Sequence, residues 1–290
     1  MSEFLQLAFS GLTVGAIYAL IALGFTLIYN ASDVINFAQG DFVMIGGMGT
    51  VFLMAAGLAL PVAALIAVIA AVLVGLLLHR LAIEPARGAS PVTLIMITIG
   101  ASIFIKGVSQ ILFDKQFHSL PAFSGDTPIP VGGATILPQS LWVMGTALAL
   151  VVALYLFLEH TLVGKAVLAT AANRLAAKLV GINVALVLAL AFGLSAAMGA
   201  LAGVVATPIT LTRYDIGTLF TLKGFAAAML GGMGNPVGAV VGGLLIGLIE
   251  TFAAGYLSST YKDAVAFLMI LVVLLFMPRG LFGSRAVERV

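Results

Sequence analysis

The sequence contains no cysteine, which excludes disulfides, thiol nucleophiles and cysteine-ligated metals. Charged residues are also scarce: they make up 8% of the chain, against about 25% in a typical soluble domain. Apolar residues take their place and account for 62% of the sequence. Because a membrane-spanning helix needs roughly 20 apolar residues, spans are expected to occupy most of the 290 residues. The chain is therefore predicted to be an integral membrane protein with a single transmembrane domain, residues 1–290.

Motifs for enzymatic chemistry are missing as well. No G-x-x-x-x-G-K-[ST] occurs, so the chain is not expected to bind ATP through a P-loop. No H-E-x-x-H occurs, and His79, His118 and His160 are scattered near the ends of apolar runs, which gives no basis for a zinc site. The formal net charge of +2 gives no support for a nucleic-acid partner. The sequence thus predicts no catalytic residue, no metal site and no cofactor in this chain.

The apolar residues gather in runs of helical length, without the alternation over about 10 residues that a β-barrel strand requires. The run that begins at Ile216 is short for a full crossing and is expected to be broken or re-entrant. The fold class is therefore predicted to be an all-α bundle of about eight or nine transmembrane helices. The candidate spans are Leu7–Tyr29, Val34–Ala56, Leu60–Leu81, Val92–Phe113, Leu137–Leu158, Val184–Thr207, Ile216–Gly231, Gly238–Tyr256 and Asp263–Met277.

Lysine and arginine are distributed unevenly between the loops, and this distribution sets the orientation in the membrane. With nine crossings, one side receives eight of these residues, namely Arg80, Arg87, Lys165, Arg174, Lys178, Arg279, Arg285 and Arg289. The other side receives three, namely Lys115, Arg213 and Lys262. Because cytoplasmic loops carry the excess of positive charge, the N-terminus is predicted to lie outside and the C-terminus in the cytoplasm.

Small residues recur every four positions in two of the runs. The strips are Ser195, Gly199 and Gly203; Gly238 and Gly242; and Gly243 and Gly247. Such strips let helix backbones approach closely in lipid, where no hydrophobic force drives helices together. They predict tight helix packing, and a glycine that lines a translocation path is the alternative.

Lys106, Lys223 and Glu250 fall inside apolar runs, where a charge costs at least about 2.5–3.5 kcal/mol. Lys106 lies near the outer end of its helix and can extend its ammonium group to the interface. Lys223 and Glu250 lie on consecutive antiparallel segments and are expected to approach each other. Two roles stay open for this pair: a buried ion pair that fixes two helices, or a place in the substrate path.

The stretch "NASDVINFAQGDF", from Asn30 to Phe42, is unusually polar for this chain. At 100° per residue, one helical face collects Asn30, Asp33, Asn36, Gly40 and Asp41, while Gln39 lies off it. Isolated polar groups in lipid would be unsatisfied, so this face must contact protein or water. The stretch is either a cytoplasmic helix–helix turn with its own caps, or the start of a broken helix that lines a polar cavity, as transporters often use.

Two long segments resemble a known family. They are "GLTVGAIYALIALGFTLIYNASDVINFAQGDFVMIGG", Gly11–Gly47, and "LKGFAAAMLGGMGNPVGAVVGGLLIGLIETFAAGYLSSTYKDAVAFLMILVVLLFMPRGLFG", Leu222–Gly283. Both closely resemble LivH-type permeases of branched-chain amino acid ABC importers. The resemblance implies a non-catalytic membrane subunit in the bacterial cytoplasmic membrane. It also implies four kinds of partner: membrane lipid, a second LivM-like permease, two cytoplasmic ATPase subunits that hold ATP and magnesium, and a periplasmic substrate-binding protein.

The charged connection 159–183 ends in "AAKLVGIN" and resembles the cytoplasmic coupling segment of this family. The match carries over Ala176, Ala177 and Gly181. The family usually has an acidic residue early in this motif, and this sequence has none there, so Arg174 and Lys178 are expected to take over the polar docking to the ATPase.

The resemblance favours the functional interpretation of the polar stretch. The substrate-path candidates are Asn36, Asp33, Gln39, Lys223 and Glu250. Importers for urea, amides or aromatic acids share this pattern and stay open as alternatives, because substrate selection rests largely on the binding protein. A self-sufficient secondary transporter is the rival from another class, and it would need an ion relay of its own within the membrane.

Overall fold

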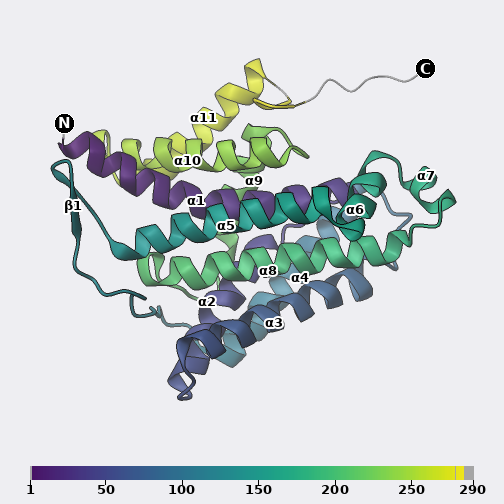
Figure 1. The fold of residues 1–290 in the computed structure, drawn as a ribbon, viewed down its shortest axis with the longest axis horizontal. Helices are drawn as coiled ribbons and strands as arrows, with labels where there is room; N and C mark the ends of the chain where they lie inside the picture. Colours follow the sequence, from purple (N-terminus) through teal and green to yellow (C-terminus); the bar gives the residue numbers. More distant parts are fainter. Residues whose placement is uncertain (1, 278, 284–290) are drawn as a thin grey trace.

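The computed structural model describes residues 2–277 and 279–283, and Arg285 and Arg289 of the predicted basic tail lie outside this range. The described chain is almost entirely helical (Figure 1), which confirms the predicted all-α membrane class. A short hairpin of β1 (Ile129–Val131) and β2 (Ala134–Ile136) lies in the loop between α4 and α5. The helices are α1 (Ser2–Ser32), α2 (Gln39–Ala55), α3 (Leu60–Leu78) with a π-helical turn (His79–Ile83), α4 (Pro91–Phe113), α5 (Pro138–His160), α6 (Leu162–Ala172), α7 (Arg174–Leu179), α8 (Val184–Thr210), α9 (Gly217–Gly231), α10 (Pro236–Tyr256) and α11 (Lys262–Phe276).

Six helices of the described chain are long and apolar enough to cross a membrane: α1, α3 with its π-helical turn, α4, α5, α8 and α10. The other three predicted spans correspond to α2, α9 and α11, which have 17, 15 and 15 residues. Each is shorter than the roughly 20 residues of a full crossing. The structure therefore does not confirm a count of eight or nine full-length spans, and it agrees with the expectation that some segments are broken.

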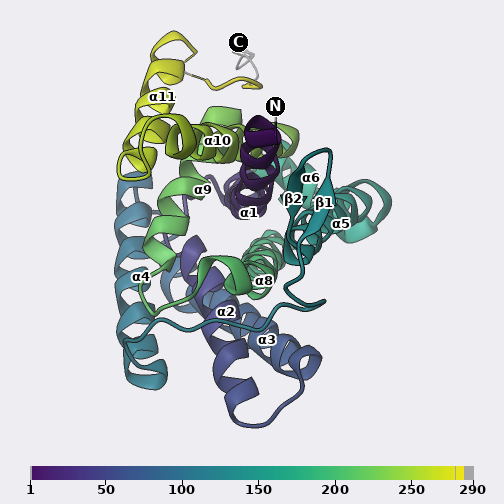
Figure 2. The ribbon, with the colours of Figure 1, turned by 90° about the vertical axis from the view of Figure 1, so that its left-hand side faces the viewer.

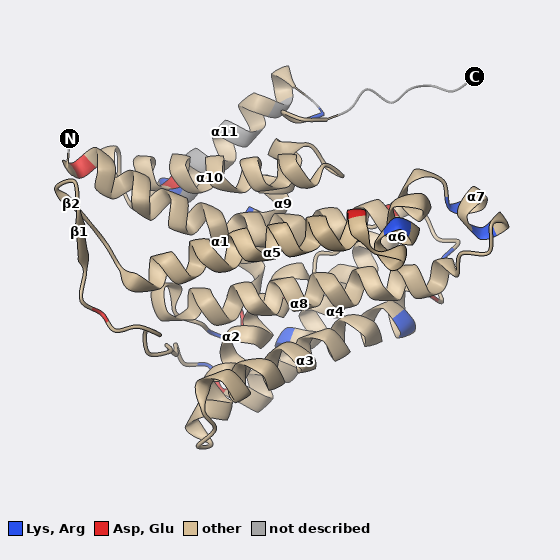
Figure 3. Cartoon of the chain, viewed as in Figure 1, with Lys and Arg blue, Asp and Glu red and all other residues tan. Residues whose placement is uncertain are grey.

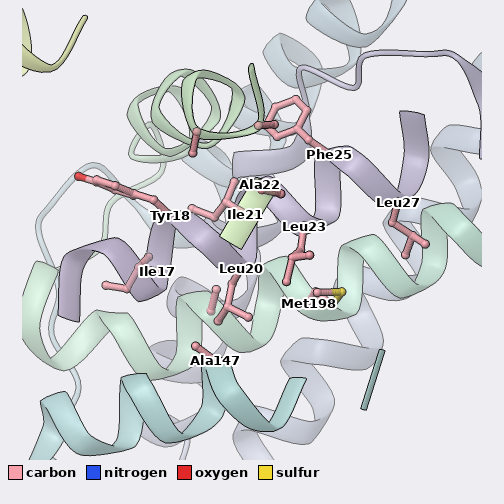
Figure 4. Packing of buried hydrophobic residues seen from close by; sticks show 14 of the residues in the cluster. Ile17, Tyr18, Leu20, Ile21, Ala22, Leu23, Phe25, Leu27, Ala147 and Met198 are labelled. Atoms are coloured by element: carbon pink, nitrogen blue, oxygen red, sulfur yellow. The ribbon is translucent and has the colours of Figure 1, made fainter. Parts of the chain in front are cut away.

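Helix α1 forms the centre of the bundle. In its most apolar 18-residue window 89% of the residues are buried, against 22%, 22% and 17% in α3, α4 and α5. Figure 2 shows α1 enclosed by α8, α9, α10 and the side of the bundle that carries α5. Figure 4 shows its side chains, such as Leu20 and Leu23, packed toward Met198 of α8 and Ala147 of α5. The outer helices leave their apolar side chains exposed, as a membrane environment permits.

The strips of small residues pack helices together, as predicted. A β-carbon added to Gly247 would overlap the backbone of Gly15, so this strip brings α10 against α1. A β-carbon added to Gly203 would overlap the backbone of Val43, so the α8 strip brings α8 against α2. These close backbone contacts replace the hydrophobic driving force that is absent in lipid.

The two ends of the bundle differ in the elements and the charged residues that lie there. The N-terminus and the β1–β2 hairpin lie at one end, and α6 and α7 lie at the other (Figure 1). Figure 3 shows lysine and arginine around α6 and α7 at this second end. This separation of charge supports the predicted orientation, which stays a prediction because the structure contains no membrane.

Candidate functional site

The polar stretch that joins α1 to α2 is not a continuous helix. Helix α1 ends at Ser32, Asp33 has a left-handed φ of 52°, and α2 begins only at Gln39. The expected helix start at Val34 is therefore wrong, and so is the single helical face inferred for this stretch. Residues 33–38 form an irregular connection instead, because the left-handed backbone at Asp33 cannot continue the helix.

Side chains from two other helices satisfy the backbone of this connection. The N–H of Phe37 donates to Thr98 Oγ1 of α4 (3.2 Å), and Thr221 of α9 donates its hydroxyl to the carbonyl of Phe37 (3.2 Å). Thr221 Oγ1 also accepts the N–H of Gly40 (2.9 Å). Irregular backbone at membrane depth is tolerated only where protein or water satisfies it. The contacts therefore favour the start of a broken helix over a solvated turn.

Two of the predicted substrate-path amides lie fully buried beside this connection. Gln39 donates to the carbonyl of Ser195 on α8 (3.2 Å) and accepts the Ser195 hydroxyl (2.6 Å). Asn36 Oδ1 accepts the N–H of Ala38 (3.1 Å), whereas its Nδ2 makes no hydrogen bond within the described chain. Gln39 thus anchors α2 to α8, and Asn36 shapes the turn that starts α2.

The acidic side chain of Asp41 is fully buried in the first turn of α2. Its carboxylate packs against Gly217, the first residue of α9. No described donor makes a hydrogen bond of acceptable geometry to either carboxylate oxygen. The N-terminal ends of α2 and α9 therefore meet around one buried acidic group.

A polar stripe on α4 faces this meeting point, and sequence reasoning missed most of it. Lys106 donates to Thr218 Oγ1 of α9 (2.7 Å), and the extension of its ammonium group to the interface stays a prediction. A cavity of about 110 Å³ lies here between α4, α9 and the connection. The helical spacing of hydroxyl and ammonium groups in an apolar run was the signal that could have identified the stripe, which comprises Thr98, Ser102, Lys106 and Ser109.

Lys223 and Glu250 meet as predicted, on the other side of α9. Lys223 Nζ lies 2.7 Å from Glu250 Oε1, and the Tyr18 hydroxyl donates to Glu250 Oε2 (2.9 Å). All three side chains are buried, and Lys262 Nζ at the start of α11 lies 3.7 Å from Glu250 Oε1. The cluster joins α1, α9 and α10, which fits a structural ion pair; its predicted place in the substrate path stays untested.

The predicted coupling segment forms two short helices, α6 and α7, at the basic end of the bundle. Asn173 caps α7 by accepting the N–H of Ala176 (2.9 Å), and Ala177 is buried against the bundle. Gly181 has a left-handed φ of 89° just after the helix, which suits glycine. Arg174 donates to Asp33 (2.8 Å), so α7 contacts the connection between α1 and α2 directly.

A second cavity, of about 550 Å³, opens beside α7 at the same end of the bundle. Its lining includes three cationic side chains, Arg87, Arg174 and Lys178. Arg87 also pairs with Glu84, whose pKa lies below its ordinary value chiefly because Arg80 donates a hydrogen bond to it (2.8 Å). This end of the bundle, for which a cytoplasmic location is predicted, therefore carries a concave, positively charged surface.

Comparisons with known proteins identify the family. A model described as "Branched-chain amino acid transport system / permease component" matches residues 7–274. The high-affinity branched-chain amino acid transport system permease protein LivH of Escherichia coli (strain K12) is 36% identical over 99% of this chain and 98% of that protein. The corresponding protein BraD of Pseudomonas aeruginosa is 34% identical over 99% and 98%. The ribose import permease protein RbsC of Escherichia coli (strain K12) is 25% identical over 89% and 82%. The chain therefore belongs to the family of permease components of branched-chain amino acid transport systems.

Proposed function

We propose that this chain is a membrane subunit of an ATP-binding-cassette importer and forms part of the path for branched-chain amino acids across the bacterial inner membrane. The observation that carries the proposal is the match of 36% to LivH of Escherichia coli along 99% of the chain. The chain itself catalyses no reaction in this proposal. ATP and magnesium bind to partner ATPase subunits, and a periplasmic protein and a second permease complete the importer.

The broken helices support a translocating role. Helices α2 and α9 both begin inside the bundle, next to each other at Gly40 and Gly217. Transporters often use such discontinuous helices because their free helix ends and irregular backbone can interact with a polar substrate. Asn36 and Gln39 lie directly before and at the start of α2, which keeps both among the candidate path residues.

The coupling role of residues 159–183 rests on shape and charge at one end of the bundle. Helix α7 and the residue that follows it expose three apolar side chains, Leu175, Leu179 and Val180, which are 69%, 80% and 76% exposed. An apolar helix face outside the membrane is suited to a groove on a partner protein. We infer that the ATPase covers this face, while Arg174 and Lys178 flank it.

The test is reconstitution of the chain with its genomic partners: the second permease, the ATPases and the binding protein. Proteoliposomes that contain the complex should take up radiolabelled leucine only when ATP is supplied on the ATPase side. Ribose serves as the competing substrate, because RbsC is a ribose import permease. Uptake of ribose without leucine would contradict the proposed substrate, and uptake by the permease alone would contradict the dependence on partners.

A further inference from the structure

The cavity of about 550 Å³ beside α7, called the basic cavity below, carries positive charge that its own wall does not balance. Arg87, Arg174 and Lys178 line it, and none of the described residues in its wall is acidic. Arg174 uses Nη2 for Asp33, and Arg87 uses Nη2 for Glu84. Lys178 makes no hydrogen bond or ion pair with a described residue. An ammonium group and most of the guanidinium N–H groups therefore stay available for an anionic ligand.

The start of α8 adds further positive character to the basic cavity. Asn183, Val184 and Ala185 line the cavity, and Val184 is the first residue of this 27-residue helix. Asn183 Oδ1 accepts the N–H of Leu186 (3.2 Å), whereas the N–H groups of Val184 and Ala185 have no acceptor within the helix. Free N–H groups give a helix start a partial positive charge. Combined with cationic side chains, they suit a phosphate group.

The basic cavity lies where four long apolar helices begin or end. Its wall includes Ser32 at the end of α1, Ile83 at the end of the π-helical turn after α3, Leu94 in the first turn of α4, and Val184 at the start of α8. All four helices are long and apolar enough to cross a membrane. The ends of such helices lie at the level of the lipid head groups, because the apolar segments fill the hydrocarbon layer. The cavity is therefore within reach of phospholipid phosphates.

The remaining wall of the basic cavity is largely apolar. It includes Val34 and Ile83, Leu94 of α4, Leu188 of α8 and Leu175 of α7, which is 69% exposed. Inorganic phosphate has no hydrocarbon to place against these side chains, whereas a phospholipid carries a phosphate and acyl chains in one molecule. Basic pockets between membrane helices are typical sites for acidic lipid head groups. The combination of charge and apolar wall therefore favours a phospholipid.

We propose that the basic cavity binds an anionic phospholipid by its head group. Lys178 and Arg87, together with the start of α8, hold the phosphate, and the apolar wall takes the first methylene groups of the acyl chains. The site goes beyond the proposed transport function, because it involves no residue of the candidate substrate path and holds for any transported substrate. Leu179 and Val180 do not line the cavity, so a bound lipid leaves them exposed for the ATPase.

The absence of native cysteine allows a direct test with the full chain in lipid nanodiscs. Leu175→Cys places a thiol on the cavity wall, and Leu179→Cys, one turn further along α7 and outside the wall, is the matched control. The probe is phosphatidylglycerol added to phosphatidylcholine. It should slow labelling by the uncharged N-ethylmaleimide several-fold at position 175 and leave position 179 unchanged. Inorganic phosphate added to phosphatidylcholine nanodiscs should protect neither position.

Charge-removing variants, each combined with Leu175→Cys, complete the experiment. Lys178→Gln with Arg87→Gln should abolish protection by phosphatidylglycerol. Lys165→Gln removes a positive charge from α6 at the same end, outside the cavity wall, and should leave protection intact.

Four results would overturn the site: no protection at position 175, equal slowing at both positions, equal protection by inorganic phosphate, or protection that survives the Lys178→Gln and Arg87→Gln double variant. Addition of the ATPase separates this inference from the proposed coupling role. If the ATPase protects position 175 and phosphatidylglycerol does not, the cavity belongs to the ATPase interface, and only the lipid site is wrong. If phosphatidylglycerol protects position 175 and the ATPase protects neither position, the lipid site holds and the coupling role fails.

Discussion

The guanidinium group of Arg174 donates to the carboxylate of Asp33 across 2.8 Å, and this contact joins α7 to the connection between α1 and α2. The connection leads directly to Gln39 and Asp41 at the start of α2. If an ATPase moves α7, the Arg174–Asp33 ion pair would therefore transmit this movement to the start of α2. The sequence separates the two residues by 141 positions, so only the fold brings them together.

We predict that charge reversal at either end of this pair weakens coupling. The pair is largely exposed, so its contribution to stability is only about 0.2–1 kcal/mol and folding should be unaffected. Asp33→Arg and Arg174→Asp should each lower the leucine taken up per ATP hydrolysed several-fold. The double reversal, which restores an attractive pair, should recover most of this ratio. No recovery in the double variant would show that the pair does not transmit movement.

A second prediction concerns the buried pair of Lys223 and Glu250. Glu250→Gln removes the carboxylate that lies 2.7 Å from the Lys223 ammonium group, and breaking a buried pair costs about 3–5 kcal/mol. The thermal unfolding temperature of the purified chain in detergent should therefore fall clearly. The double variant Lys223→Met with Glu250→Leu removes both charges and should unfold near the unmodified protein. If this stable double variant no longer transported leucine, the pair would belong to the substrate path after all.

Much of the fold could be predicted because lipid enforces a simple pattern. Every backbone group inside a bilayer must be satisfied, so long apolar runs become helices, and each of the nine predicted runs contains a helix in the structure. The approach of Lys223 to Glu250 followed from the cost of an unpaired charge in the same surroundings. These inferences need only local composition and the order of segments along the chain.

The candidate site escaped prediction where helices break and distant segments meet. The left-handed backbone of Asp33 displaced the start of α2 to Gln39, and no local propensity indicated this break. The local sequence did not indicate the burial of Asp41, because this burial depends on the start of α9 more than 170 positions further along the chain. The residues of the stripe that contains Ser102 and Lys106 are spaced to lie on one face of a helix. The sequence did not show that α9 contacts this face.

We predict that the N-terminal end of the bundle faces the outside. Ser119 lies exposed in the loop between α4 and α5, and Gly88 lies exposed in the loop between α3 and α4, where an added β-carbon meets no atom within 4 Å. In intact cells, an impermeant maleimide should label Ser119→Cys and should label Gly88→Cys only after permeabilisation. The reverse pattern would contradict the orientation inferred from lysine and arginine.

Asn36 offers a test of the turn that starts α2. Its Oδ1 accepts the N–H of Ala38, and leaving a buried donor without a partner costs about 1–3 kcal/mol. Asn36→Leu should therefore lower the unfolding temperature modestly and leucine uptake strongly, because α2 loses its fixed starting point. Asn36→Ser, which keeps a hydroxyl acceptor, should retain more of both. Equal uptake by the unmodified protein and Asn36→Leu would show that this turn has no part in transport.

The last prediction concerns the apolar face of α7. Leu179 and Val180 are 80% and 76% exposed. Helix α7 lies at the end of the bundle opposite the β1–β2 hairpin. Covering an exposed apolar side chain with a partner protein contributes a favourable free energy of roughly 25 cal/mol for each Å² removed from water. These side chains should therefore contribute directly to ATPase binding. Leu179→Asp should reduce co-purification of the ATPase several-fold while the chain itself stays folded in the membrane.

Val131 on the hairpin provides the matched control for this variant, because it is also an exposed apolar residue outside the helices that span the membrane. Val131→Asp adds the same charge at the opposite end and should leave ATPase binding unchanged. Gly181→Val should act like Leu179→Asp, since a β-branched residue cannot readily adopt the left-handed φ of 89° that ends α7. Unchanged co-purification of the ATPase with both Leu179→Asp and Gly181→Val would show that α7 is not part of the ATPase interface. The basic cavity lined by Arg87 would then be the remaining candidate contact surface at this end.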